Sequence, residues 1–149
     1  RFSGYNFFVK TGPETAHQKN TLRVIFEDSV GLTDLEDFFP EVINWQPLYD
    51  LYVVKDEIVV TIEVTGIEPR DVMIYAGKTY LLVKGKRRSP EYLDKTCCVF
   101  HNLEIPYGQF YRRIDLPLPV EPHKIRVRIE NGLLTLQLPA LKEKFIAID

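Results

Sequence analysis

The sequence has little cysteine, tryptophan or methionine, and it has no long apolar run. Its only two cysteines, Cys97 and Cys98, are adjacent in a chain of 149 residues. Neighbouring residues on a strand point to opposite faces, so a bridge between these two would be strained. Without a disulfide framework, we expect a reducing, cytoplasmic location. No segment approaches the roughly 18 apolar residues that a membrane span needs.

Charge of one sign is also lacking. Nineteen Lys and Arg residues oppose 21 Asp and Glu residues, which leaves a formal net charge of -2. The basic cluster at 84–88 has no interleaved aromatic residues, unlike a single-strand binding surface. The sequence therefore predicts no nucleic-acid partner and no membrane partner. A hydrophobic content of 45% indicates one globular domain with arms, long enough to bury a core.

Arrangements typical of catalysis or metal binding are absent from the sequence. Gly77-Lys78-Thr79 has the ending of a phosphate-binding loop, but Val72 stands where that motif needs a glycine. The three histidines, His17, His101 and His123, are scattered and have no second ligand at metal spacing. No nucleophile motif is recognisable. We predict no enzyme, no cofactor and no metal site, which leaves a binding or assembly protein.

Residues 1–46 form an aromatic-rich arm without sustained hydrophobic periodicity. A short helix is predicted from Thr33 to Phe39, with Thr33 as N-cap and Pro40 as the stop. The rest of the arm is expected to be irregular. Its phenylalanines and the only tryptophan either cover one end of the core or bind apolar surface on a partner: Phe2, Phe7, Phe8, Phe26, Phe38, Phe39 and Trp45.

Residues 47–139 contain short runs in which apolar and polar residues alternate, as in half-buried strands. Asn131-Gly132 is typical of a tight hairpin turn. Seven to nine strands with regular turn signals predict an all-β, immunoglobulin-like antiparallel β-sandwich. The excursion at 85–105 is long enough to suggest pairing outside its own sandwich. The predicted strands are 48–54, 58–64, 71–76, 80–84, 96–105, 110–116, 125–130 and 134–138.

Residues 140–149 form a short extension that carries an isolated apolar pair. Ile146 and Ile148 follow the polar run Lys142-Glu143-Lys144. In an extended segment both side chains point to the same side. We therefore predict that the pair fills a groove elsewhere in an assembly.

Five short motifs follow one another along the chain. They are Leu48-Tyr49-Asp50-Leu51-Tyr52, the turn at 64–72, the strand at 107–117, the hairpin at 131–136, and Ile146-Ala147-Ile148. In this order and spacing they resemble the α-crystallin domain of the small heat-shock proteins, the Hsp20 family, in its non-metazoan type. The resemblance covers residues 47–139 and the extension, whereas residues 1–46 match only in kind.

Two places depart from the family pattern. Val127 stands where an alanine is usual, four residues before the hairpin asparagine. The segment 102–106 is less charged than usual, and it belongs to the region that non-metazoan members exchange between the two subunits of a dimer. The length of the excursion still favours exchange.

The resemblance implies an ATP-independent holdase chaperone that binds unfolded or partly unfolded client proteins. It implies a dynamic homo-oligomer built from homodimers, with the aromatic arm as the client-binding segment, because non-native chains expose apolar surface without a fixed shape. Arg112 is expected to pair with an acidic residue at the dimer seam or, alternatively, to be exposed. The predicted seam residues are Arg112, Thr96, Cys97, Cys98 and Val99.

The resemblance also implies where the apolar pair of the extension binds. Ile146 and Ile148 would insert between edge strands of a neighbouring dimer, here 71–76 and 125–130. Each contact would be weak, and many would add by avidity. The predicted groove residues are Val72, Ile74, Ile125, Val127 and Ile129.

Two other classes of β-sandwich protein are alternatives. A p23-like co-chaperone acts as an adaptor on a larger chaperone, but its members typically end in an acidic tail and lack the isoleucine pair. A carbohydrate-binding module would show an exposed row of aromatic residues on one sheet face, and Trp45 is the only tryptophan. Both alternatives are less favoured than the holdase.

Overall fold

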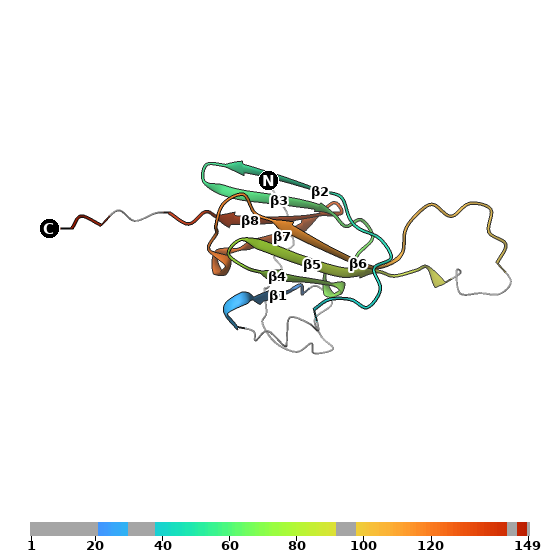
Figure 1. Ribbon diagram of the computed structural model, residues 1–149. Helices are drawn as coiled ribbons and strands as arrows, with labels where there is room; N and C mark the ends of the chain where they lie inside the picture. Colours follow the sequence, from blue (N-terminus) through green and yellow to red (C-terminus); the bar gives the residue numbers. More distant parts are fainter. Residues whose placement is uncertain (1–20, 30–37, 92–97, 143–145, 149) are drawn as a thin grey trace.

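A computed structural model describes residues 21–29, 38–91, 98–142 and 146–148. Its eight strands form two four-stranded sheets, ordered β1-β4-β5-β6 and β2-β3-β8-β7 (Figure 1). All strand pairs are antiparallel except β1 with β4. The β-sandwich prediction is confirmed. The strands are β1 Arg23–Phe26, β2 Tyr49–Val54, β3 Glu57–Glu63, β4 Val72–Ala76, β5 Tyr80–Arg87, β6 Gly108–Asp115, β7 Arg126–Glu130 and β8 Leu133–Pro139.

The two central strands of the second sheet supply much of the core. In the β3–β8 register, Ile58, Val60 and Ile62 face Leu138, Leu136 and Leu134, and all six side chains are fully buried. The alternating pattern therefore predicted the correct inward faces. The β7–β8 turn is also as predicted, since Asn131 and Gly132 both adopt positive φ, at 52° and 77°.

The prediction of an irregular arm was wrong at β1. Arg23 pairs with Met73 and Phe26 with Ala76, so β1 lies parallel to the edge of β4. Leu22 and Val24 are 1% and 0% exposed and belong to the main core. A strand of four residues is too short to show a clear alternation of apolar and polar residues. Its position depends on its partner β4, which lies about 50 residues away in the sequence.

The predicted helix from Thr33 to Phe39 falls mostly outside the described residues. Only Phe38 and Phe39 are described, and they lie in a turn and a bend. No helix is therefore described in the arm beyond the three-residue 3-10 turn η1, Glu27–Ser29.

The predicted strand at 96–105 was wrong over 98–105, where the described chain forms no strand. In Figure 1 this part of the β5–β6 connection projects away from the sandwich. None of the described strands pairs with it, so its backbone has no ladder partner within that part of the chain. By contrast, β5 extends to Arg87, three residues beyond the prediction.

Two further findings concern the described part of the chain. None of its helices is long and apolar enough to cross a membrane. In the same residues, no group of three or more His, Cys, Asp or Glu side chains is placed to hold a metal ion.

Candidate functional site

The predicted groove residues lie along one rim of the sandwich, which we call the β4–β7 rim. Val72 and Ile74 of β4 are 2% and 0% exposed. Three side chains in and just before β7 are half-buried and pack against the same core cluster: Ile125, Val127 and Ile129. The structure thus brings the two predicted halves of the groove together, but it also places β1 against β4, so the chain itself covers this rim.

Polar and aromatic contacts tie the end of β1 to the β4–β7 rim. The Nε2 atom of His123 lies 2.6 Å from Oδ2 of Asp28, and the His123 ring stacks on Phe26 with centroids 4.3 Å apart. The backbone N–H of Lys78 donates to Oε2 of Glu27 at 3.2 Å. The hydrogen bond from His123 lowers the pKa of Asp28. His123 belongs to the 3-10 turn η4, Pro122–Lys124, just before β7.

The opposite side of the second sheet ends in β2, and we call its outer side the β2 edge. β2 pairs with β3 on one side, and among the described residues no strand pairs with the other side. Three apolar or aromatic side chains of β2 are exposed: Tyr52, Val53 and Val54. Unpaired backbone groups beside exposed apolar side chains are what another extended segment binds.

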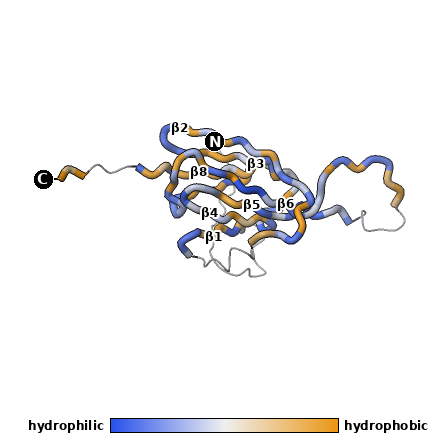
Figure 2. Tube along the Cα trace, viewed as in Figure 1, coloured by the Kyte–Doolittle hydropathy of each residue, from blue (hydrophilic) through white to orange (hydrophobic). Residues whose placement is uncertain are grey.

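The excursion between β5 and β6 carries exposed apolar side chains of its own, namely Val99, Phe100, Leu103 and Ile105. Figure 2 shows hydrophobic colouring on this projecting segment, far from the sandwich core. Of the predicted seam residues, Val99 is exposed and Cys98 is a half-buried free thiol. Thr96 and Cys97 lie outside the described residues.

Arg87 anchors the root of this excursion, a role that the sequence analysis missed. Its side chain is buried, with Nε donating to the Thr65 carbonyl at 3.0 Å and Nη1 to the Pro106 carbonyl at 2.9 Å. Its guanidinium carbon lies 4.1 Å from the ring centroid of Trp45. Trp45 donates from Nε1 to the Gly108 carbonyl at 3.0 Å. One buried cation therefore joins both ends of the excursion to the sandwich.

Arg112 lies on β6 close to the start of β2. Its Nη1 donates to the Pro47 carbonyl at 3.0 Å, and its guanidinium carbon is 4.6 Å from the ring centroid of Tyr49. Within the described residues no carboxylate lies at ion-pairing distance from Arg112. The guanidinium is thus placed at the β2 edge, next to the predicted seam.

The apolar pair of the extension does not fold back onto its own sandwich. Ile146 and Ile148 are 82% and 95% exposed. Figure 1 shows the C-terminal end leaving the sandwich on the side opposite to the excursion, and Figure 2 shows its hydrophobic colouring.

The described aromatic residues of the arm have unequal exposure. Phe38 is only 3% exposed and forms a second apolar cluster with Tyr75 and Leu82, whereas Phe39 is exposed. Phe26 and Trp45 are half-buried and pack against the main core. The packing of Phe26 and Trp45 agrees with the alternative in which the arm covers the core, whereas Phe38 packs in the second cluster. Phe2, Phe7 and Phe8 lie outside the described residues.

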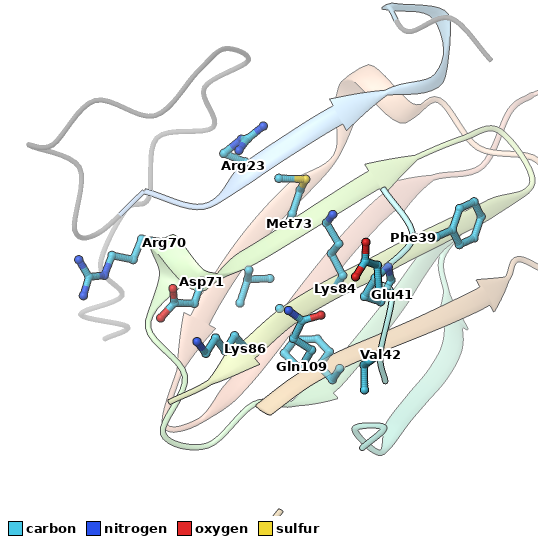
Figure 3. A pocket seen from close by; sticks show the side chains of 14 residues that line it. Arg23, Phe39, Glu41, Val42, Arg70, Asp71, Met73, Lys84, Lys86 and Gln109 are labelled. Carbon is cyan, nitrogen blue, oxygen red and sulfur yellow. The ribbon is translucent and has the colours of Figure 1, made fainter. Parts of the chain in front are cut away.

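The second cluster lies on the outer face of the first sheet, beside a cavity of about 500 Å³. Figure 3 shows Met73, Lys84 and Gln109 on successive strands of this face, with Phe39 and Val42 on the segment that crosses it. Lys84 Nζ lies 4.7 Å from the ring centroid of Phe38. Burial raises the pKa of the Tyr75 hydroxyl, as expected for a phenol held in an apolar cluster.

Known proteins are similar to this chain in sequence. A 22.7 kDa class IV heat shock protein from Pisum sativum is 34% identical over 84 residues, which cover 56% of this chain and 42% of the relative. Heat shock protein 16 from Schizosaccharomyces pombe is 27% identical over 97 residues, which cover 65% of this chain and 68% of the relative. The chain thus spans less than half the length of the first relative and about two thirds of the second.

Two solved structures have the same fold. The structure of heat shock protein 16.0 from Schizosaccharomyces pombe has a TM-score of 0.59 at 28% identity, covering 70% of this chain and 99% of that one. A small heat-shock protein from Xylella fastidiosa also has a TM-score of 0.59, at 25% identity, covering 71% of this chain and 98% of that one.

The family model matches most of the sandwich and the extension. It is described as the Hsp20/alpha crystallin family, and it aligns with residues 50–148. That range contains all but the start of the first of the five sequence motifs, six of the eight strands in full, and all but the first residue of β2. Because the match extends over well more than half of the chain, this protein belongs to the Hsp20/alpha crystallin family.

Proposed function

We propose that the protein is an ATP-independent holdase chaperone, which binds unfolded or partly unfolded proteins and prevents their aggregation. It works as a dynamic homo-oligomer built from dimers. The observation that carries this proposal is the pair of exposed apolar segments, 98–107 and 146–148, that leave the sandwich on opposite sides. Family membership supports the same function.

The dimer forms when the excursion of one subunit pairs with the β2 edge of the other. The excursion has exposed β-forming side chains and no strand partner among the described residues of its own chain, and the β2 edge has unpaired backbone groups. Pairing would satisfy both and bury apolar side chains on each. Thr96, Cys97, Cys98 and Val99 belong to this seam in the proposal.

Arg112 supports the seam from β6. It holds the Pro47 carbonyl and the Tyr49 ring at the start of β2, and a carboxylate of the partner would complete its coordination. Arg112→Ala is expected to weaken the dimer, which sedimentation at low micromolar concentration measures. Arg113→Ala is the control, because that exposed neighbour points away from the core on the same strand. An unchanged mass for Arg112→Ala would contradict the seam role.

Oligomers form when Ile146 and Ile148 of one dimer bind the β4–β7 rim of another. Burial of two isoleucines contributes roughly 3–6 kcal/mol before the cost of ordering the extension. Each contact is therefore weak, and several in one assembly add by avidity. Such an oligomer holds together and still exchanges subunits.

Client binding is assigned to the arm, residues 1–46, with 47–139 as the α-crystallin domain and 140–149 as the extension. Phe39 is the arm phenylalanine that the structure describes as exposed. Phe26, Phe38 and Trp45 are packed, so they would reach a client only after the arm detaches from the sandwich.

The test is light scattering of a heat-unstable client, without ATP, at sub-stoichiometric to equimolar chaperone. Suppression of aggregation is expected, and its absence at every temperature would refute the holdase proposal. A variant with serine at Phe2, Phe7, Phe8 and Phe39 should keep its oligomeric mass but lose suppression. Full suppression by that variant would place client binding outside these four residues.

A further inference from the structure

The groove that the extension is proposed to fill is already filled by the same chain. Leu22 and Val24 are fully buried, and so are Val72 and Ile74 on the adjacent strand β4. All four side chains belong to one continuous core cluster. On its inward side, β4 therefore has no exposed apolar surface left for a second pair of aliphatic side chains.

The segment in this position has the same pattern as the extension. Leu22-Arg23-Val24 and Ile146-Ala147-Ile148 are both an apolar pair separated by one residue. In each, an extended backbone points both apolar side chains to one side. The structure shows this for β1, because Leu22 and Val24 are buried while Arg23 lines the outer cavity.

Besides this apolar pair, half-buried Phe26 packs against the main core and stacks on His123, and Ile25 packs against the second cluster. The one strand partner of β1 is β4, over four residues. The contacts that follow it, from Glu27 to Lys78 and from Asp28 to His123, are exposed to solvent and therefore weak. Inside the rim itself, β1 and an extension would each bury two aliphatic side chains at the same place, so the two segments cannot occupy it together.

We propose that β1 is an internal competitor of the extension. The Leu22–Phe26 segment closes the β4–β7 rim of its own subunit, and Ile146 and Ile148 of a neighbouring subunit bind there only when β1 leaves. This inference rests on the proposed contact between the extension and the rim, and it adds the regulation of that contact. The apparent affinity for the extension is then reduced by the fraction of subunits whose rim is open.

The competition also links assembly to the arm. β1 lies within residues 1–46, so its departure from β4 frees the arm at the same time as the rim receives a neighbour. Oligomer growth and exposure of the arm therefore rise together. A subunit with β1 in place has a closed rim and receives no extension from a neighbour.

The test measures binding of a fluorescent peptide of residues 141–149 to full-length protein in which Ile146→Gly and Ile148→Gly remove the internal copy. Adding Leu22→Ser and Val24→Ser should increase peptide affinity at least about tenfold, because the rim is open in more subunits. Arg23→Ser, on the outer side of the same strand, is the matched control and should leave the affinity unchanged. Circular dichroism checks that each variant is folded.

A disulfide lock gives an independent measurement should the serine variants unfold. Arg23→Cys with Met73→Cys joins directly paired residues of β1 and β4, with Cys97→Ser and Cys98→Ser preventing other bridges. Oxidation should abolish peptide binding, and a reducing agent should restore it.

The outcomes separate this inference from the proposed function. Equal peptide affinity with and without Leu22→Ser and Val24→Ser, or peptide binding to the locked protein, would overturn the competition and leave the extension–rim contact standing. Absence of peptide binding to every variant would overturn both. A peptide with glycine in place of both isoleucines should not bind in any case.

Discussion

The two lateral edges of the sandwich differ in whether the chain itself covers them. At the β2 edge, backbone groups and the side chains of Tyr52, Val53 and Val54 face solvent, and among the described residues nothing covers them. At the β4–β7 rim, β1 is paired to β4, and its side chains complete the core. One edge is thus ready for a partner, whereas the other has an occupant that must first leave.

This difference matches two kinds of association in the proposed mechanism. An open edge binds a partner without any prior cost, so it suits a lasting dimer. A covered edge binds a partner only in exchange for an internal segment, so it suits a reversible contact between dimers. The following variants would break or sharpen this contrast.

The largest effect is expected from the extension, at the covered rim. Ile146→Gly with Ile148→Gly removes roughly 3–6 kcal/mol from each contact between dimers. The assembly should fall to dimers or small oligomers in size-exclusion chromatography with light scattering. Ala147→Gly, in the same segment, should keep the full assembly. An intact oligomer in the double variant would refute the assignment.

Next comes Arg87, which anchors the excursion that serves the open edge. Arg87→Ala should reduce the free energy of unfolding by about 2–4 kcal/mol, because two carbonyls lose a charged donor and Trp45 loses its stacked cation. Lys86→Ala, an exposed neighbour on β5, should change it by less than about 0.5 kcal/mol. Urea denaturation measures both. Equal effects would show that Arg87 has no anchoring role.

The excursion itself tests the open edge directly. Leu103→Ser with Ile105→Ser, in protein lacking both tail isoleucines, should weaken the dimer by about 2–3 kcal/mol, or roughly 30- to 150-fold in dissociation constant. Sedimentation equilibrium measures this constant. Asn102→Ser in the same segment serves as control and should leave it unchanged. A dimer that tolerates the double variant would have its seam elsewhere.

The smallest effect concerns the ion pair that holds the end of β1. Pairing with His123 lowers the pKa of Asp28 from 3.8, so the stabilisation it gives is present above that value and is lost as pH falls through the lowered pKa. Asp28→Asn removes the carboxylate and with it this pH-dependent stabilisation. The difference in urea midpoint between wild type and variant should therefore shrink as pH falls below 3.8. Parallel profiles down to pH 2 would mean that the pair does not stabilise the fold.

Most of the sandwich was predictable because its signals are local. In β3 and β8 the alternation of apolar and polar residues gave the correct inward faces, and Asn131-Gly132 gave the turn between β7 and β8. The motif order gave the family. The length of the excursion indicated an unusual segment, but the strand predicted in it is not formed over 98–105. A strand forms only beside another strand edge, and none of the described strands pairs with this segment.

Other parts depend on contacts between distant residues. Arg87 has the appearance of one more basic residue in the 84–88 run, and only the approach of Thr65, Pro106 and Trp45 makes it a buried anchor. Phe38 and Phe39 are neighbours of the same type, yet one is buried against Tyr75 and the other is exposed. Composition cannot separate such a pair.

The sequence by itself determined the sandwich, the family and the two apolar segments that leave the core, because strand periodicity, turn residues and motif spacing are written within short stretches. Only the tertiary structure decided that β1 covers the β4–β7 rim while the β2 edge stays open. The apolar pattern of Leu22-Arg23-Val24 is as short as that of the extension, and its place depends on which strand edge it meets. That choice is made by long-range packing, which no local pattern records.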